Sequence, residues 1–462
     1  MPLIKSISGI RGTIGGKVGE NLTPVDIVKF TSAFVSFLKK NDLSKPLSII
    51  IGRDARISGQ IINQLVCATL QGMGVNVIDV GLSTTPTVEM AVVHHQADAG
   101  IILTASHNPM QWNALKLLNH KGEFISGKEA IELLEIVERQ DFNYANIKEL
   151  GTSVQYQNAI SDHIDKILKL DLVDVEAITR SNLSVMVDCV NSTGGIAIQP
   201  LLERLGVNDI TLLYGEPTGI FPHNPEPLPE HLHEISNCMK KGNYDVGFVV
   251  DPDVDRLAIV MEDGEMFGEE YTLVAVSDYV LQHKKGNTVS NLSSTRALRD
   301  ISQKHGVQYN AAAVGEVNVV EKMKTTDAVI GGEGNGGIIY PELHYGRDAL
   351  VGIALFLSYM ARSKKDCGEI RRQYSSYYIS KNKIELKPEM NLANILNYIA
   401  EKYVAYEVNR LDGVKIDFED SWVHLRSSNT EPIIRIYAEA GTEGMAEHLA
   451  NKIMLDIREF IN

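Results

Sequence analysis

A repeated alternation of strand-length apolar runs and helical periodicity constrains the fold of this 462-residue chain more than any other feature. Residues 47–51, 75–80 and 100–103 predict strands, because each is an apolar run of strand length. A helix is predicted to begin at Thr23-Pro24, with threonine as the N-cap and proline at the first helical position. Strands that alternate with helices in this way predict a parallel sheet with helices packed on it.

The same plan restarts twice along the chain and then changes. The second unit has predicted strands at 183–188, 210–214 and 245–250, and the third has them at 288–292, 307–313 and 328–331, followed by a helix over 348–360. Residues 414–418, 422–426 and 433–438 instead alternate apolar and polar side chains, as half-exposed antiparallel strands do, before a final helix over 444–460. We therefore predict an α/β fold of three similar α/β domains plus a smaller α+β domain, with bounds 1–150, 155–262, 263–372 and 375–462.

Charge and composition exclude several classes of protein. Against 59 Asp and Glu stand 44 Lys and Arg, and the net charge of −15 repels phosphate backbones, so we expect no nucleic-acid partner. The longest mostly apolar stretch, 349–361, is shorter than the roughly 20 residues that cross a bilayer, so no membrane partner is expected. The four cysteines are scattered and the N-terminus has no apolar signal block, which predicts reduced thiols in a cytoplasmic protein.

The first chemically unusual segment is the serine loop (residues 104–109), directly after the strand at 100–103. In open α/β sheets ligands bind at the carboxyl ends of the strands, so this is a place to look for a site. Ser106 lies beside His107 and is followed ten residues later by Lys116, so it could be a nucleophile or a phosphate carrier. The alternative is a Ser/Asn-Pro turn that only ends the strand.

The aspartate loop (residues 251–256) predicts a metal site. Asp251, Asp253 and Asp255 alternate along a turn between two predicted strands, and three such carboxylates can converge on one hard cation. A calcium hand is excluded, because Arg256 stands where that loop needs glycine and because strands rather than helices flank the turn. The alternative is a solvated acidic hairpin.

Two further loops offer binding groups. The glycine-rich loop (residues 331–337) has five glycines in seven residues, which let backbone approach a ligand, while Glu333 and Asn335 can bind hydroxyl groups. Its spacing fits neither a dinucleotide fingerprint nor a phosphate-binding loop, and the alternative is a flexible turn. The arginine loop (residues 426–432) combines Arg426 with small polar side chains and free N–H groups, as a dianion cradle or, alternatively, as an ordinary hairpin turn.

Together the four loops resemble those of the α-D-phosphohexomutases, in the same order. The shared motifs are Ser-His-Asn-Pro, Asp-x-Asp-x-Asp-Arg, Gly-Glu-x-x-Gly and Arg-x-Ser-Asn-Thr-x-Pro, and the resemblance extends back to Ser8-Gly9-Ile10-Arg11-Gly12. It implies three similar α/β domains with mixed sheets and a C-terminal α+β domain, arranged around a central cleft.

The resemblance also implies a role for each motif residue. Ser106 would carry the phosphoryl group, and Asp251, Asp253 and Asp255 would bind one Mg²⁺ together with a phosphoryl oxygen on Ser106. Arg11 and Arg256 would neutralise the transferring group, and His107 and Lys116 would assist at the reacting hydroxyl. Glu333 and Asn335 would hold the sugar. The other phosphate would be gripped by Arg426, Ser428, Asn429 and Thr430. Gly315-Glu316 is a weaker match to another sugar-facing loop.

The activity implied is transfer of a phosphoryl group between the 1 and 6 positions of a hexose phosphate, with a hexose bisphosphate as intermediate and activator. Many members that act on mannose or glucose phosphates read Gly-Glu-x-Ser-Gly-His in the third loop, whereas Asn335 resembles members that handle amino sugars. We therefore favour glucosamine phosphate, with mannose or glucose phosphate as the alternative, and a monomer or homodimer. A metal-dependent phosphatase or a phosphosugar sensor is the rival class, but no Asp-x-Asp occurs near residue 50 and the chain keeps Ser106 and all three aspartates.

Overall fold

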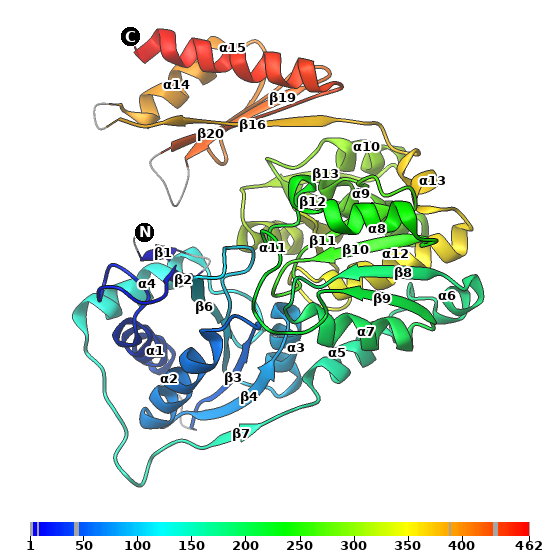
Figure 1. Ribbon diagram of the computed structural model, residues 1–462. Coiled ribbons are helices and arrows are strands. Elements are labelled where there is room, and N and C mark those ends of the chain that lie inside the picture. Colours follow the sequence, from blue (N-terminus) through cyan, green and yellow to red (C-terminus); the bar gives the residue numbers. More distant parts are fainter. Residues whose placement is uncertain (1–2, 7–8, 41–45, 388–389, 428–432, 462) are drawn as a thin grey trace.

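The computed structural model describes residues 3–6, 9–40, 46–387, 390–427 and 433–461, which form four sheets in chain order (Figure 1). The first is seven-stranded, in the order β1-β2-β6-β5-β3-β4-β7. Its strands are β1 (Ile4–Ser6), β2 (Gly9–Thr13), β3 (Ser48–Arg53), β4 (Asn76–Leu82), β5 (Ala99–Leu103), β6 (Trp112–Leu118) and β7 (Ser153–Gln155). Its helices are α1 (Pro24–Lys39), α2 (Gly59–Gly72), α3 (Thr85–His94) and α4 (Gly127–Arg139). As expected, Thr23 caps α1 and a proline opens it.

The second and third sheets have four strands each, in the orders β11-β10-β8-β9 and β13-β12-β14-β15. The second consists of β8 (Ser184–Asp188), β9 (Asp209–Leu213), β10 (Val246–Val250) and β11 (Leu257–Met261), with α5 (Ala159–Ile167), α6 (Val175–Ser181), α7 (Gly194–Arg204), the 3₁₀ turn η1 (Pro229–His231) and α8 (His233–Lys241). The third consists of β12 (Asn287–Asn291), β13 (Tyr309–Ala312), β14 (Ala328–Glu333) and β15 (Gly337–Ile339), with α9 (Glu269–His283), α10 (Ala297–Lys304), α11 (Glu316–Thr325), α12 (Ala349–Ser363) and α13 (Cys367–Arg371).

The fourth sheet is antiparallel throughout, in the order β16-β20-β19-β18-β17, and its two helices lie together on one face (Figure 1). Its elements are β16 (Tyr378–Glu385), α14 (Leu392–Lys402), β17 (Glu407–Asn409), β18 (Val414–Asp417), β19 (Trp422–Ser427), β20 (Ile433–Ala440) and α15 (Glu443–Ile461). The predicted fold class, three α/β units with mixed sheets and a C-terminal α+β unit, is confirmed.

The first three sheets share one plan that positions the site. In each, the last parallel strand pairs with an antiparallel neighbour, β5 with β6, β10 with β11 and β14 with β15, and in the first sheet β2 and β1 extend the antiparallel side further. The turns of these three hairpins contain the serine, aspartate and glycine-rich loops. The third hairpin corrects the sequence analysis, because β14 runs on to Glu333 rather than ending at Gly331, since Gly331, Gly332 and Glu333 all pair with β15.

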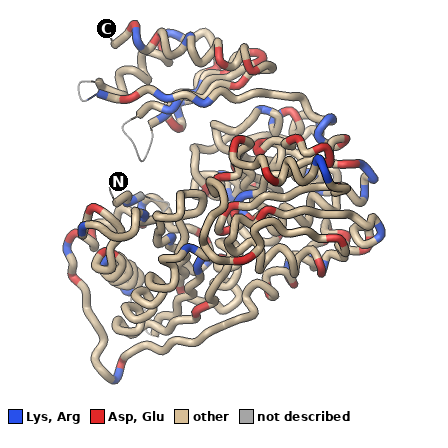
Figure 2. Tube along the Cα trace, in the orientation of Figure 1, with Lys and Arg blue, Asp and Glu red and all other residues tan. Residues whose placement is uncertain are grey.

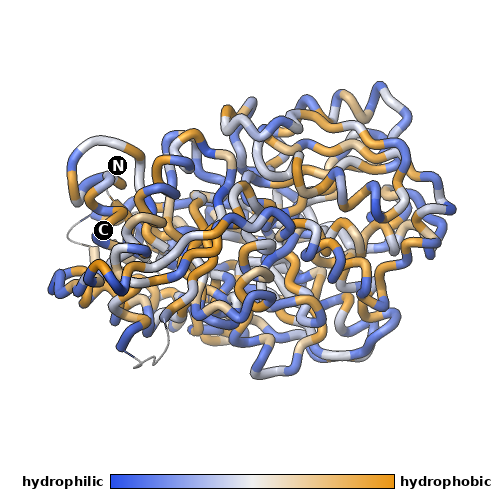
Figure 3. Tube along the Cα trace, turned by 90° about the horizontal axis from the view of Figure 1, so that it is seen from below, coloured by the Kyte–Doolittle hydropathy of each residue, from blue (hydrophilic) through white to orange (hydrophobic). Residues whose placement is uncertain are grey.

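The apolar stretch 349–361 is a buried helix. Every residue of α12 from Ala349 to Ala361 is buried, within a single hydrophobic core that the second and third sheets share. No helix in the described part of the chain combines the length and the apolarity needed to cross a membrane. Figure 3 shows hydrophobic stretches in the strands and hydrophilic ones at many outer turns.

Candidate active site

The serine loop and the aspartate loop meet directly. Ser106 is 7% exposed, and its hydroxyl donates a hydrogen bond of 2.6 Å to Oδ2 of Asp251. The same hydroxyl lies 3.3 Å from Nδ1 of His107. Ser106 has a left-handed backbone with φ +46°, which a non-glycine residue adopts at a cost. The loop is therefore shaped to present this hydroxyl rather than only to end a strand.

Arg56, which the sequence analysis did not single out, holds the serine loop in that shape. The side chain is 1% exposed, its Nε donates to Asp54 at 3.0 Å, and its terminal nitrogens donate to four backbone carbonyls of the loop region. Those carbonyls belong to Ser106, Asn108, Pro109 and Trp112. Asp54 and Arg56 directly follow the carboxyl end of β3, so the rule that led to Ser106 also points to them.

The three aspartates converge as predicted, because the hairpin turn folds them inward. Asp251, Asp253 and Asp255 are 0% exposed, and one carboxylate oxygen of each lies within 4.8 Å of the others. Oδ1 of Asp251 accepts the backbone N–H groups of Asp255 and Arg256, at 3.2 Å each, which fixes the turn. Complete burial excludes the solvated hairpin as the alternative.

Fixed cations balance only part of this negative charge. Nζ of Lys116 lies 2.8 Å from Oδ2 of Asp253 and 3.7 Å from Oδ2 of Asp255, and the Thr85 hydroxyl donates to Asp253 at 2.5 Å. Burial, followed by the neighbouring aspartates, raises the pKa of Asp251 well above its usual range. Burial also acts to raise the pKa of Asp253, but Lys116 outweighs it and the net pKa is lowered.

The aspartates fit a divalent cation. Oδ1 of Asp253 and Oδ1 of Asp255 are buried and have no hydrogen-bond partner among the described residues. Such orphaned carboxylate oxygens are costly unless a cation neutralises them, and an all-oxygen donor set suits a hard ion such as Mg²⁺.

The glycine-rich loop holds Glu333 in place. Its Oε1 accepts Nδ2 of Asn291 at 2.8 Å and the backbone N–H of Gly315 at 3.0 Å. Asn335 accepts the N–H of Gly337 at 3.2 Å. Because a carboxylate oxygen carries two lone pairs, Glu333 keeps acceptor capacity for hydroxyl groups.

Arg347, also missed from the sequence, joins two of these loops. Its guanidinium donates to Oδ2 of Asp255 at 2.7 Å, to Oε2 of Glu333 at 2.7 Å and to Oε2 of Glu316 at 3.1 Å. These carboxylates raise its pKa well above the usual value, against the opposing effect of burial. It directly precedes Asp348, the N-cap of α12, so its position at the start of a buried helix was the available signal.

Four arginines form an arginine cluster (Arg11, Arg256, Arg426 and Arg435) that lacks matching carboxylates. Burial, followed by Arg435 and Arg256, lowers the pKa of Arg11, and burial followed by Arg435 lowers that of Arg426. Nε of Arg11, Arg256 and Arg426 has no hydrogen-bond partner among the described residues, and the ion pairs of Arg256 with Glu226 and Asp255 are long, at 3.4 and 4.0 Å. Mutually repelling cations of this kind predict an anionic ligand.

The cluster also links the first and last sheets. Arg426 and Arg435 face each other across β19 and β20, and Arg435, which the sequence analysis missed, lies near enough to perturb Arg11. Figure 2 shows acidic and basic segments side by side at the centre of the molecule and basic segments on strands of the last sheet. Ser428, Asn429 and Thr430 lie outside the described residues.

His107 is held in its neutral form. Burial, followed by Arg256 and Arg11, lowers its pKa well below the usual value. A neutral imidazole 3.3 Å from the Ser106 hydroxyl can accept a proton.

Known proteins share this fold across the whole chain. Models of phosphoglucomutase/phosphomannomutase alpha/beta/alpha domains I, II and III match residues 4–144, 161–264 and 268–377, and that of the C-terminal domain matches 384–455. A phosphoglucomutase/phosphomannomutase of Thermococcus kodakarensis is 34% identical over 94% of this chain and 95% of its own length. The chain belongs to the phosphoglucomutase/phosphomannomutase family. Members of this phosphohexomutase family are isomerases that use a metal ion.

Two further matches support the membership. A phosphoglucosamine/phosphogalactosamine mutase of Sulfurisphaera tokodaii is 32% identical over 96% of this chain and 97% of its own. The solved structure of a phosphoglucomutase/phosphomannomutase family protein from Burkholderia thailandensis superimposes with a TM-score of 0.84 at 25% identity, covering 99% of this chain and 96% of that one. The family resemblance read from the four loops is thus confirmed.

Proposed function

We propose that the protein moves a phosphoryl group between the 1 and 6 positions of a hexose phosphate, through phosphorylated Ser106 and a hexose bisphosphate, and that glucosamine phosphate is its preferred substrate. The observation that carries the proposal is the 2.6 Å hydrogen bond from Ser106 to Asp251, beside two orphaned carboxylate oxygens. A hydroxyl suited to carry phosphate and carboxylates suited to hold a cation thus lie within one hydrogen bond of each other, which supports the proposal.

The transfer itself needs alignment and charge neutralisation more than covalent chemistry. The P–Oγ bond of phosphorylated Ser106 breaks as a bond forms from phosphorus to the free sugar hydroxyl, whose proton passes through neutral His107 to the departing Ser106 oxygen. Asp251, Asp253 and Asp255 would hold a Mg²⁺ ion, which would supply charge neutralisation at the transferring group. Burial acts to lower the pKa of Lys116, but Asp253 and Asp255 together outweigh burial and raise the pKa, so Lys116 remains a cation beside them.

The second half-reaction requires the bisphosphate to turn end over end, so that its other phosphate returns to Ser106. A site that accepts either end needs a fixed phosphate grip away from the serine, and the arginine cluster supports that role for Arg426 together with Ser428, Asn429 and Thr430. Arg11 and Arg256 would stabilise the transferring group. A hexose bisphosphate would also phosphorylate resting Ser106, which is how it would activate the enzyme.

The sugar preference rests on the glycine-rich loop. The Glu333 carboxylate can accept from ring hydroxyls or from a substrate ammonium, and Asn335 offers both an acceptor and a donor to an amino substituent. The name of the Sulfurisphaera tokodaii relative supports this preference, and that of the Thermococcus kodakarensis relative supports the alternative, mannose or glucose phosphate. We expect the enzyme to act on its small-molecule substrate in the cytoplasm, as a monomer or homodimer.

A substrate panel tests the proposal. We would measure kcat/KM for the phosphates of glucosamine, N-acetylglucosamine, glucose and mannose, with Mg²⁺ and the matching bisphosphate present. Because one hydrogen bond contributes about 1 kcal/mol, we expect glucosamine phosphate to lead by roughly fivefold. A preference above about tenfold, or 1.4 kcal/mol, for mannose or glucose phosphate would contradict the amino-sugar preference and leave the mutase reaction standing.

A further inference from the structure

Arg347 is the one described side chain that contacts the aspartate loop, the glycine-rich loop and Glu316 at once. Asp255, Glu333 and Glu316 come from three different elements: the β10–β11 turn, the end of β14 and the start of α11. A planar guanidinium donates in fixed directions, so three such bonds set the distance between the two loops. A lysine ammonium cannot reproduce that fork.

Arg347 also occupies the space that a side chain at position 337 of the glycine-rich loop would fill. A β-carbon at Gly337 would lie 2.3 Å from Cδ of Arg347, so the two cannot both be bulky. Position 337 is where many mannose and glucose members place histidine in the motif of this loop. The space beside the sugar-binding turn is therefore filled by Arg347, from the segment that leads into α12, and the turn depends on Arg347 for its support.

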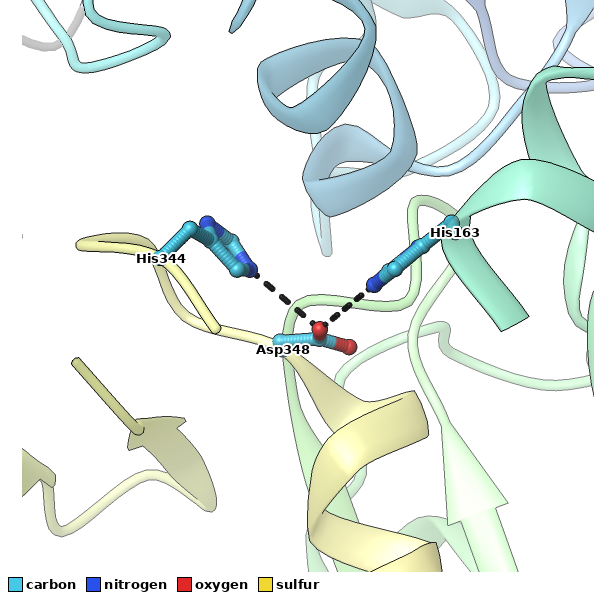
Figure 4. A group of neighbouring side chains, drawn as sticks. All are labelled: His163, His344 and Asp348. Atoms are coloured by element: carbon cyan, nitrogen blue, oxygen red, sulfur yellow. Dashed lines mark hydrogen bonds and ion pairs between the residues drawn. The ribbon is translucent and has the colours of Figure 1, made fainter. Parts of the chain in front are cut away.

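The chain on both sides of Arg347 is anchored in a buried cluster, through His344 before it and Asp348 after it (Figure 4). Nε2 of His163 and Nε2 of His344 both approach Oδ2 of Asp348, at 2.9 and 3.2 Å, from opposite sides. Nδ1 of His344 lies 3.2 Å from the Glu89 carboxylate. Burial acts to lower the pKa of His344, but Asp348 and Glu89 together outweigh it and raise the pKa to about 10.

These atoms are close enough to suggest a metal site, since one ligand atom of each of His163, His344 and Asp348 lies within 4.8 Å of the others. The hydrogen bonds show instead that these atoms already have protein partners. The Thr87 hydroxyl accepts from Thr84 and lies 2.9 Å from Nδ1 of His163. Nε2 of His163 lies 2.9 Å from Oδ2 of Asp348, so both ring nitrogens of His163 are within hydrogen-bond distance of a side-chain oxygen.

The cluster joins three elements that bear on the site. Glu89 and Thr87 lie on α3, whose first residue, Thr85, donates to Asp253, while His163 lies on α5 and Asp348 caps α12. The backbone on either side of Arg347 is thus tied to the helix that supports the aspartate loop.

We propose that Arg347 is a positioning residue, which fixes the glycine-rich loop relative to the aspartate loop and competes with the bound cation for Asp255. The inference rests on the proposed function for its consequence in turnover, but its contact with Asp255 can be tested by binding alone. A misplaced sugar slows transfer even when it is bound as tightly, because the reacting hydroxyl no longer lies in line with the phosphoryl group.

Arg347→Lys is the informative variant, because it keeps the charge that three buried carboxylates need, whereas a neutral residue risks unfolding the protein. We expect kcat on glucosamine phosphate to fall about a hundredfold while KM changes by less than about threefold. In calorimetric titration, Mg²⁺ affinity should rise by about threefold or more, because the ion no longer competes with the charge-assisted hydrogen bond from the Arg347 guanidinium to Asp255. Tighter metal binding with slower turnover is a combination that general loss of structure does not produce.

Arg362→Lys is the matched control. Arg362 lies in the last turn of α12, the helix that begins just after Arg347, and its Nε pairs with Asp174 at 2.8 Å, outside the site residues, so kcat and Mg²⁺ affinity should remain unchanged. Equal kcat in Arg347→Lys and the parent would overturn the proposal, as would weaker Mg²⁺ binding together with lower kcat. Elemental analysis provides a test of the cluster of His163, His344 and Asp348. A tightly bound transition metal in the parent that is absent from His344→Gln would show that these residues form a metal site, and would overturn their role in anchoring Arg347.

The two proposals fail in different ways. If the parent enzyme shows no mutase turnover with any of the four hexose phosphates, the proposed function fails, while the Mg²⁺ titration still tests the contact of Arg347 with Asp255. If turnover is present and Arg347→Lys leaves both kcat and Mg²⁺ affinity unchanged, only the role of Arg347 fails.

Discussion

The aspartate loop and the arginine cluster are both buried charges, but they are built in opposite ways. Around the aspartates, Lys116, Arg347 and Ser106 already make bonds of 2.6–2.8 Å, so most carboxylate oxygens have partners before any ligand binds. For Arg11 and Arg426 the largest effect of any charged neighbour on the pKa comes from another arginine, Arg435, and their Nε groups lack hydrogen-bond partners among the described residues. One region is assembled in advance, and the other depends on the ligand for its counter-charge.

The largest effect should come from Ser106→Ala, which removes the proposed phosphate carrier. We expect mutase turnover to fall by several orders of magnitude with the fold intact, because no other group takes over the transfer. Intact mass spectrometry provides an independent measurement: the parent should gain one phosphate after incubation with a hexose bisphosphate, and the variant should not. A parent protein that never gains a phosphate would refute the carrier role.

Asp253→Asn tests the preassembled region. Replacing this carboxylate should weaken Mg²⁺ binding about tenfold or more and lower kcat, since it removes a charge and an orphaned anionic oxygen together. A chelator should inhibit the parent enzyme reversibly. Asp263→Asn is the control, because Asp263 is exposed in the turn that joins β11 to α9, outside the aspartate loop. Full activity in excess chelator would exclude the metal site.

Arg426→Ala tests the region that depends on ligand. The loss of one charge-assisted bond to phosphate should raise KM about tenfold, with a smaller fall in kcat because the remote phosphate helps to place the reacting end. Mg²⁺ affinity should not change. Arg410→Ala is a control in the same domain, where Nη1 of Arg410 binds only Asn397 at 2.7 Å among the contacts described. Unchanged kinetics in Arg426→Ala would mean that the arginine loop is an ordinary hairpin turn.

The smallest expected effect is that of salt, which should weaken substrate binding at the arginine cluster more than it affects the aspartate loop. Arg11, Arg426 and Arg435 are half-buried, whereas the three aspartates are fully buried. Raising KCl beyond about 0.1 M, where the Debye length is near 10 Å, should raise KM for the hexose phosphate several-fold while changing kcat at saturating Mg²⁺ little. A larger effect on kcat than on KM would contradict this division.

The sequence predicted the site residues that lie within one unusual turn and missed those whose role comes from contacts between distant parts of the chain. Ser106 and the three aspartates are readable because each follows a strand in an unusual turn, and their meeting follows from the family resemblance. Arg56, just after a strand, and Arg347, just before a buried helix, give only a weak signal and Arg435 gives none, since an arginine beside a strand or helix is ordinarily solvated. Only the packed structure places Arg56 on four backbone carbonyls and Arg347 on three carboxylates.

The end of β14 could not be placed from composition either. Glycines interrupt the apolar run at Gly331, so the pattern predicts a loop there, yet pairing with β15 extends the strand to Glu333. The strand conformation in turn gives Glu333 its fixed position. The proposed grip of Ser428, Asn429 and Thr430 on phosphate remains a prediction from the sequence, because these residues lie outside the described part of the chain.

The threefold use of one hairpin has a consequence for how specificity can be redesigned. Because the proposed carrier, cation and sugar groups occupy equivalent turns in three separate sheets, one turn can be exchanged without rebuilding the strands that support the other two. The short turn between β14 and β15 is therefore a natural graft site, provided that position 347 is exchanged with it, since the arginine there and a bulky residue at 337 exclude each other. A library that varies 335, 337 and 347 jointly should yield substrate variants that a library of the turn alone would lose.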